Sequence, residues 1–480
     1  MKTLQVIVNK HFIGRVAERK QLIEIGEFDA AAIIIMYGRR RVGKTELIEQ
    51  TYAKRNIVKI EGIEGRDEQA QRQHVLLQMS LLTQDPTYAK LHYETWTEIF
   101  ELLAKLIKKG VWTLYFEEVQ WLANYKSAFI AELKYVWDNA FRYNKDLRLI
   151  LCGSSPSFMV NEVMHSKALY NRSQFEIHLT PLTLMDTKTM LAGRSNREVM
   201  DAYLTLGGIP DYLKRVNNGP SIYLGICEQA FKKDGFFSTE YKRIFISSLA
   251  ESTHYQEIIE FLSKTHFATR SEIANHLGIK AGGTLTTVMN DLLLCGFIEE
   301  YTSFHLPNSS SLLRYTVGDN YLVFYFKFIK PFTKQIAAGK FNQMPLQALK
   351  QDTYYKWLGF SFERFCRNND FIIAKMLGFS GIQFESGAYF SKKYEKEHPS
   401  FQIDLIFDRA DQVLTICEIK YLQRKVDVGI IEEFERKIAL LPNPKKRTIH
   451  KVLIAATGAT DSLINRHYFD QIITLDDFFQ

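Results

Sequence analysis

The segment Gly38–Thr45 constrains this chain more than any other. It reads G-x-x-x-x-G-K-T, follows the apolar run 30–37, and leads into a helical pattern that begins at Glu46. An uninterrupted apolar run is typical of a strand buried on both faces of a parallel sheet. A strand, a glycine loop and a helix in this order predict a phosphate-binding loop, because the loop amides and the helix N-terminus both face an anion. We therefore expect ATP to bind the loop residues Gly38, Arg39, Arg40, Arg41, Val42, Gly43, Lys44 and Thr45.

Two acidic residues at the end of a later predicted strand complete this expected site. The strand 111–116 is followed directly by Glu117 and Glu118. Glu117 and the hydroxyl of Thr45 would hold Mg²⁺, and Lys44 would reach the outer phosphates. Glu118 would orient and activate the attacking water as a catalytic residue. Because Glu117 stands where Asp is usual, the sequence leaves the rate of ATP hydrolysis open.

A third predicted strand, 147–152, ends in the small polar residues Gly153, Ser154 and Ser155. Their position suits a sensor of the γ-phosphate, but an ordinary turn capped by serine would have the same sequence pattern. Further along, Arg172 could reach the nucleotide within one chain or across a subunit interface.

Length and composition limit the classes of protein that this chain can belong to. With 480 residues it needs two to four domains, and its content of 46% hydrophobic and 24% charged residues is typical of globular proteins. The net charge of +7 permits nucleic acid as a partner, although solvated lysines explain it equally well. The five scattered cysteines, together with an N-terminus too polar for a signal peptide, predict a cytoplasmic protein. No apolar run is long enough to predict a membrane span.

Six segments between residues 12 and 215 occur in a recognisable order: FIGRVAERKQL, YGRRRVGKTELI, YFEEVQWL, LCGSSPSFM, LYNRSQFEIHLTPL and LGGIPDYL. Together they resemble the archaeal-type P-loop ATPase family, which is related to AAA+ and STAND ATPases. The resemblance implies an ATPase fold with ATP and Mg²⁺ as ligands. It also implies that the segment from Phe12 lies beside the adenine, and it allows a homo-oligomer, since many related ATPases complete their sites across subunits.

The middle of the chain, from Tyr255 to about Val317, reads as a winged helix. Helices are expected over 255–262, 271–278 and 284–294, followed by a hairpin. The third helix offers mainly threonines with Asn290 and Asp291, which is a poor set for reading DNA. A role in packing against another part of the protein is therefore at least as well supported. The aromatic run 319–329 is expected to form a helix wedged between domains.

The C-terminal part brings three charged residues onto a predicted hairpin. The strand 401–407 carries Asp404, and the strand 413–420 places Glu418 and Lys420 on one face because side chains alternate with period two. Asp404 and Glu418 suit a divalent metal, and Lys420 could position a hydroxide against a phosphodiester. The set resembles the PD-(D/E)xK restriction-endonuclease-like core, with Ile403 in place of the proline. In that resemblance, Glu363 matches the helix acid that many members add as a catalytic residue.

The sequence thus predicts an α/β chain in three modules: a P-loop NTPase parallel sheet, an α-rich winged helix and a small α/β nuclease-like domain. The expected boundaries are 1–235 with a helical lid, 236–330, a linker over 331–350, and 351–480. One hypothesis is that nucleotide state controls a magnesium-dependent nuclease that acts on DNA. A second is a nucleotide-dependent switch whose last domain only binds nucleic acid or a partner. A transcription regulator working through the winged helix ranks third.

Overall fold

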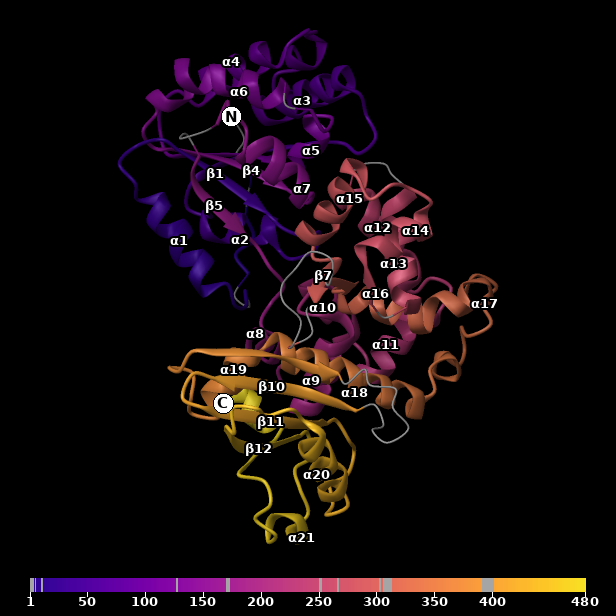
Figure 1. Cartoon of the computed structure of the whole chain (residues 1–480). Coiled ribbons are helices and arrows are strands. Elements are labelled where there is room, and N and C mark those ends of the chain that lie inside the picture. Colours follow the sequence, from indigo (N-terminus) through magenta and orange to yellow (C-terminus); the bar gives the residue numbers. More distant parts are fainter. Residues whose placement is uncertain are drawn as a thin grey trace.

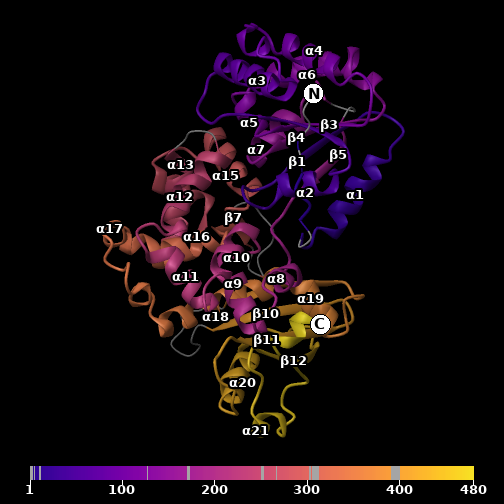
Figure 2. The same cartoon turned by 180° about the vertical axis from the view of Figure 1, so that it is seen from behind.

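A computed structural model describes residues 4, 6–9, 12–126, 128–169, 173–249, 253–265, 267–301, 304, 313–390 and 401–480. Figures 1 and 2 show the chain from opposite sides. An α/β region with the N-terminus lies at one end, a sheet region with the C-terminus lies at the other, and a helical region lies beside and between them.

The N-terminal region is built on a five-stranded parallel sheet with the order β2-β3-β4-β1-β5. The strands are β1 (Ala32–Tyr37), β2 (Asn56–Glu61), β3 (Trp112–Glu117), β4 (Leu147–Gly153) and β5 (Ser173–His178). The apolar run predicted as a buried strand is β1, and its residues Ala32–Met36 are fully buried. Ile34 and Met36 join the core on one face of the sheet, whereas Ile33 and Ile35 join the core on the other. Both faces are therefore covered, as a parallel sheet requires.

Helices cover the two faces of this sheet. The first core includes side chains of α1 (Val16–Gly26) and α2 (Lys44–Thr51). The second includes α3 (Glu68–Thr83), α4 (Trp96–Leu106) and α6 (Ala128–Asn139), and α4 begins at a capping box formed by Thr95 and Glu98. Shorter elements of this region are η1 (Tyr88–Lys90), α5 (Val119–Leu122), η2 (Phe141–Tyr143), α7 (Pro156–Phe158) and η3 (Met159–Met164).

A lid of helices follows β5 and leads into the middle region. The lid comprises α8 (Leu184–Met190), α9 (Asn196–Leu206), α10 (Pro210–Asn217) and α11 (Ile222–Phe231). The middle region comprises α12 (Phe236–Ser248), α13 (Thr253–Thr265), β6 (Ala268–Thr269), α14 (Arg270–Leu277), α15 (Gly283–Leu294), β7 (Ile298–Tyr301) and β8 (Arg314–Val317). The last three helices lie where the sequence predicts them, and β6-β8-β7 form a small antiparallel sheet.

The aromatic run after β8 is buried between regions, as expected for a wedge. It forms α16 (Asn320–Phe324) and η4 (Tyr325–Ile329), and the hydroxyl of the fully buried Tyr321 donates to the carbonyl of Phe237 at 2.7 Å. The segment expected as a linker contains η5 (Lys330–Phe332), α17 (Thr333–Ala337) and η6 (Pro345–Ala348). It is held to the fold because Ile336, Phe341 and Leu349 are buried.

The C-terminal region is a mixed sheet with the order β13-β12-β11-β10-β9. Its elements are α18 (Gln351–Asn368), α19 (Asp370–Met376), β9 (Phe384–Phe390), β10 (Gln402–Arg409), β11 (Val413–Lys420), α20 (Ile430–Leu440), β12 (Thr448–Ala455), α21 (Asp461–Ile464), β13 (Gln471–Ile473) and η7 (Asp476–Phe479). β10 and β11 form the predicted antiparallel hairpin, and β12 continues the sheet parallel to β11. Across the described ranges, no helix combines the length and apolarity that crossing a bilayer requires.

Candidate nucleotide and metal sites

The predicted phosphate loop connects β1 to α2 in a conformation that requires its glycines. Gly38 has φ +153°, and a Cβ at this position would come within 2.2 Å of the carbonyl oxygen of Leu179. Gly43 has φ +94° immediately before α2 begins at Lys44. The loop is also braced from the N-terminal segment, because the guanidinium of Arg15 donates to the carbonyl of Val42 at 2.9 Å. Arg15 belongs to the segment that the resemblance places beside the nucleotide.

Lys44 is folded back onto its own loop. Its side chain is buried, and Nζ donates to the carbonyl oxygens of Gly38 at 2.9 Å and Arg39 at 3.2 Å. A buried ammonium group needs such partners, since an unpaired charge in the protein interior is costly. The ammonium group is therefore held inside the loop, where an incoming phosphate would replace the carbonyls.

The two acidic residues after β3 have different partners. Thr45 Oγ1 donates to the carboxylate of Glu117, which also forms an ion pair with Lys59 of β2. Thr45 and Glu117 therefore meet, as the expected magnesium site requires. The chemistry of the pair fits Mg²⁺, which takes oxygen ligands from hydroxyls and carboxylates and keeps several waters.

Glu118 has a left-handed backbone with φ +54° and points to the end of β4. Its Oε2 accepts hydrogen bonds from Gln120 Nε2 at 2.6 Å and from the backbone N–H and hydroxyl of Ser154. Ser154 is one of the predicted sensor residues, whereas Gln120 was not predicted. The neighbouring Ser155 is fully buried, and its hydroxyl finds no hydrogen-bond partner within the described residues.

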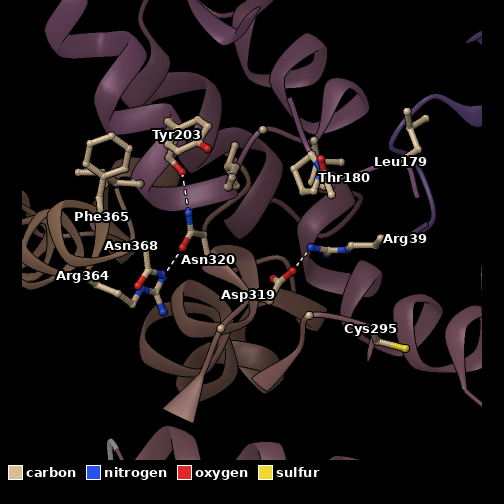
Figure 3. A pocket seen from close by; sticks show the side chains of 18 of the residues that line it. Arg39, Leu179, Thr180, Tyr203, Cys295, Asp319, Asn320, Arg364, Phe365 and Asn368 are labelled. Atoms are coloured by element: carbon tan, nitrogen blue, oxygen red, sulfur yellow. Dashed lines mark hydrogen bonds and ion pairs between the residues drawn. The ribbon is translucent and has the colours of Figure 1, made fainter. Parts of the chain in front are cut away.

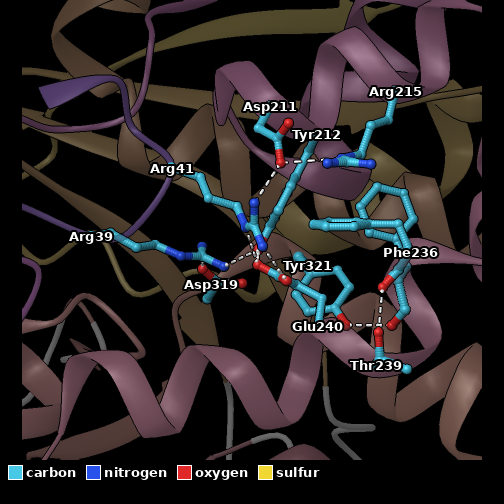
Figure 4. Close-up of polar contacts among 11 residues, drawn as sticks. Arg39, Arg41, Asp211, Tyr212, Arg215, Phe236, Thr239, Glu240, Asp319 and Tyr321 are labelled. Atoms are coloured by element: carbon cyan, nitrogen blue, oxygen red, sulfur yellow. Dashed lines mark hydrogen bonds and ion pairs between the residues drawn. The ribbon is translucent and has the colours of Figure 1, made fainter. Parts of the chain in front are cut away.

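Two arginines of the loop turn away from it, as Figure 4 shows. Arg39 forms an ion pair with Asp319, which precedes α16, and donates to the hydroxyl of Tyr212 in α10 at 3.1 Å. Arg41 pairs with Glu240 of α12 at 2.7 Å and with Asp211 of α10 at 2.9 Å.

The sequence predicts both arginines as nucleotide ligands, but in the structure their side chains bind the lid and the middle region. Only tertiary contacts decide this, because nothing in the loop pattern identifies their partners. Arg172, the other arginine considered above, lies outside the described residues.

The four charged residues predicted for the C-terminal region come together from three elements. Asp404 lies on β10, Glu418 and Lys420 lie on β11, and Glu363 faces them from α18. Burial raises the pKa of Glu363 to about 7, and the charge of Asp404 adds to this rise. Burial and the charge of Glu418 raise the pKa of Asp404. The shifts show that the carboxyl groups of Glu363 and Asp404 are buried close to other negative charge.

Hydrogen bonds hold two of these carboxylates in place. Asp404 Oδ2 accepts from the backbone N–H of Ile419 at 3.0 Å. Glu418 is fully buried and accepts from Lys420 Nζ at 2.7 Å. It also accepts from Lys437 of α20 at 2.9 Å and 2.8 Å, one bond to each oxygen. Lys437 was not predicted, although a lysine on the apolar face of an amphipathic helix is a signal that could have indicated it.

A metal ion at this place would rely on few protein ligands. Within the part of the chain that the structure describes, no group of three or more His, Cys, Asp or Glu side chains is arranged to hold a metal ion. Mg²⁺ is commonly bound through one or two carboxylates, several waters and substrate phosphate. Asp404 and Glu418 fit that mode of binding and do not fit a closed protein cage.

The lid contacts the C-terminal region directly through α9. The hydroxyl of Tyr421, the residue after β11, donates to Asp201 at 2.7 Å, and the hydroxyls of Thr205 and Tyr354 share a hydrogen bond of 2.7 Å. Burial raises the pKa of Asp201 to about 6. The lid is therefore attached to the residue that directly follows Lys420.

A cavity of about 360 Å³ lies where the ATPase sheet, the lid, the middle region and α18 meet, and Figure 3 shows its lining. Arg39 and Asp319 lie on one side. On the other, Asn320 donates to the carbonyl of Tyr203 at 2.9 Å and accepts from Arg364 of α18. Arg364 also donates to the carbonyl of Val317 at 2.8 Å. One short segment, Asp319-Asn320, thus joins the phosphate loop to α18.

The parallel sheet, the glycine loop and the residues at the ends of β1, β3 and β4 define a P-loop ATPase-like domain. Comparison with known families agrees, because residues 12–216 match the ATPase domain described as predominantly from Archaea.

Other similarities extend further along the chain. An uncharacterized protein of Methanocaldococcus jannaschii, MJECL04, is 28% identical over 416 residues, which cover 86% of this chain and 88% of that protein. Its similarity therefore continues well past the ATPase domain. The Walker-type ATPase PABY2304 of Pyrococcus abyssi is 17% identical with a TM-score of 0.48, over 68% of this chain and 98% of that one. The Aeropyrum pernix ORC2 protein is 12% identical with a TM-score of 0.41, over 70% and 98% of the two chains.

Proposed function

We propose that this protein hydrolyses ATP and uses its nucleotide state to control a magnesium-dependent nuclease site that acts on DNA. The observation that carries the proposal is the convergence of Glu363, Asp404, Glu418 and Lys420 from α18, β10 and β11. The modules are assigned as 1–235, an ATPase with its lid; 236–330, a winged helix; 331–350, a connecting segment; and 351–480, a PD-(D/E)xK nuclease-like domain.

The charge balance of the C-terminal site supports this chemistry. Glu363 has a pKa of about 7 because it is buried beside Asp404. A cation bound nearby would therefore stabilise the ionised forms of these carboxyl groups. A divalent ion bound there would polarise a phosphodiester and supply a hydroxide nucleophile near neutral pH. Lys420 lies at the end of β11 with its side chain partly exposed, where it can reach a phosphate. Glu363 would accept or donate a proton at a pKa suited to neutral pH.

The ATP site is assigned to the phosphate loop and the ends of β3 and β4. Lys44 and the loop amides would hold the phosphates, and Thr45 with Glu117 would hold Mg²⁺. Glu118 would activate water once it is released from Ser154, to which it is hydrogen-bonded in this structure. Hydrolysis therefore requires Glu118 to change partners.

Two contacts support communication between the ATP site and the nuclease-like site. Arg39 of the phosphate loop is paired with Asp319, and the next residue, Asn320, accepts from Arg364 of α18. Arg364 directly follows Glu363 in the sequence. The second contact joins Asp201 of the lid to Tyr421, next to Lys420. A shift of the loop or the lid on ATP binding would thus reach residues adjacent to the proposed nuclease site.

A second function, a nucleotide-dependent switch without cleavage, is favoured by one observation. Glu418 is already paired with Lys420 and Lys437. These two ammonium groups neutralise its carboxylate even when no metal is bound. In that case the C-terminal domain would bind nucleic acid or a partner. A homo-oligomer, which the resemblance to related ATPases allows, would fit either function.

The experiment that tests the proposal is a cleavage assay on the full-length chain. Linear and circular DNA would be incubated with Mg²⁺ or Mn²⁺, and with ATP, ADP or no nucleotide. We expect cleavage that stops when EDTA removes the metal, resumes when excess Mg²⁺ is added, and changes in rate between ATP and ADP. The opposite result is a protein that binds and hydrolyses ATP yet cuts neither single-stranded nor double-stranded DNA with either metal. That result would reject the nuclease proposal in favour of the nucleotide-dependent switch.

The route through Asp319 predicts a variant in which ATP no longer controls cleavage. Asp319→Asn keeps an N-cap for α16, since Asn and Asp cap equally well, but it removes the charge that faces Arg39. We expect the change in cleavage rate on adding ATP to fall from about tenfold to less than about twofold, a typical coupling range. ATP affinity, measured by calorimetry, should change less.

The matched control is Asp352→Asn, which removes an exposed carboxylate at the start of α18. Because Asp319→Asn leaves the buried Arg39 without its counter-ion, the double variant Arg39→Met with Asp319→Asn serves as a second test. Full control by ATP in both Asp319 variants would contradict this route.

A further inference from the structure

The carboxylate of Glu418 is paired with two lysines, Lys420 and Lys437, whose side chains differ in solvent exposure. Lys437 reaches it from α20, which lies against the C-terminal sheet in Figures 1 and 2. The Lys437 side chain is 8% exposed, whereas that of Lys420 is 29% exposed. Lys437 Nζ bonds both oxygens of Glu418, at 2.9 Å and 2.8 Å, and Lys420 Nζ bonds one, at 2.7 Å.

The burial of Lys437 follows from the face of α20 that carries it. Phe434, one turn earlier, is fully buried and belongs to the core beneath the sheet. A lysine on such a face is rare unless it is paired, because desolvation of an ammonium group costs several kcal/mol. The two bonds to Glu418 supply that pairing. The ion pair with Glu433 is longer, at 3.7 Å, and Glu433 is half exposed.

The two lysines therefore have separable tasks. If Lys420 were the sole cation on Glu418, moving it to a substrate phosphate would leave a fully buried carboxylate unpaired. Because Lys437 already bonds both oxygens, Lys420 can leave Glu418 without that cost. Lys437 also adds one positive charge next to the carboxylates, which weakens their attraction for a divalent cation.

We propose that Lys437 is a positioning residue of the nuclease-like site: it stays paired with Glu418 and so releases Lys420 for the phosphate of the nucleic acid. The inference rests on the proposed nuclease function, and it adds that metal binding is weak until the negative phosphate of the substrate arrives. The site would then gain its metal together with its substrate.

The test compares three variants of the full-length chain at pH 8: Lys437→Met, Lys437→Arg and Lys451→Met. Lys451 lies on β12 and pairs with the exposed side of α20 through Glu435, so its variant removes the same charge away from the site. Binding of Mn²⁺ without nucleic acid is measured by titration calorimetry, and cleavage is measured separately at saturating metal.

For Lys437→Met we expect Mn²⁺ to bind about tenfold more tightly and cleavage at saturating metal to slow at least about tenfold. In this variant Lys420 has to stay paired with Glu418, so the metal affinity rises while the cleavage rate falls. Loss of stability alone would not move these two quantities in opposite directions. Lys437→Arg should restore most of the wild-type metal affinity, and Lys451→Met should resemble the wild type in both measurements.

Each alternative result is informative. Unchanged Mn²⁺ affinity in Lys437→Met, or equal changes in Lys451→Met, would overturn the inference. If the wild type binds Mn²⁺ and Lys437→Met binds it more tightly, but neither cuts DNA, the pairing role of Lys437 stands and the nuclease function fails. If neither the wild type nor Lys437→Met binds Mn²⁺ at the C-terminal site, with or without DNA present, both fail together.

Discussion

Asp404→Asn should lower metal-dependent DNA cleavage at least about a thousandfold and leave ATP binding unchanged. Asn keeps the shape of the side chain, and its carbonyl can still accept from the N–H of Ile419. What disappears is one of the two carboxylates available to a divalent ion. A thousandfold loss corresponds to about 4 kcal/mol of transition-state stabilisation, within the range expected when a metal site loses a ligand. The measurement is the single-turnover cleavage rate at saturating Mg²⁺.

The control for this prediction lies on the same hairpin. Asp411 is in the exposed turn between β10 and β11, and Asp411→Asn should cleave at the wild-type rate. Thermal unfolding of both variants shows whether the sheet is intact. Cleavage by Asp404→Asn at the rate of the Asp411 variant would exclude Asp404 from the chemistry.

Lys44→Ala should weaken ATP binding at least about a hundredfold. The Lys44 ammonium group is buried and bonded to the Gly38 and Arg39 carbonyls, in the loop that the phosphates would enter. Truncating one partner of a buried charge pair costs about 2–5 kcal/mol, and a hundredfold is about 2.7 kcal/mol. Calorimetry with ATP, and the rise in unfolding temperature on adding ATP, both measure the loss.

Lys54→Ala is the matched control, because Lys54 is exposed just after α2 and carries the same charge. It should bind ATP as the wild type does. An ATP-induced rise in unfolding temperature that is equal in Lys44→Ala and Lys54→Ala would contradict the assignment of the loop.

The nucleotide domain could largely be predicted from local patterns. The buried strand β1, the positive φ angles at Gly38 and Gly43, and the start of α2 at Lys44 follow from residues within one short segment. The meeting of Thr45 with Glu117 also follows, since Glu117 ends β3 and Thr45 begins the helix after the β1 loop, both at the carboxyl edge of one parallel sheet.

In the C-terminal region the hairpin pattern was sufficient to bring Asp404 near Glu418. Period-two alternation sets the face of each strand, and an antiparallel pair brings those faces together. Glu363 could be placed only through resemblance, because the position of α18 across the sheet depends on tertiary contacts. The roles of these residues in catalysis stay predictions.

The sequence by itself determined the phosphate loop, the order of the elements and the charged residues of the hairpin, because each depends on neighbours in the chain or on strand periodicity. Only the tertiary structure decided that Arg39 and Arg41 bind Asp319 and Glu240, and that Lys437 pairs with Glu418. The arginine pairs join residues more than a hundred positions apart, and Lys437 lies on a separate helix from the strand of Glu418. A buried charge takes whichever counter-ion the packing of distant elements brings within reach, and no local pattern specifies that partner.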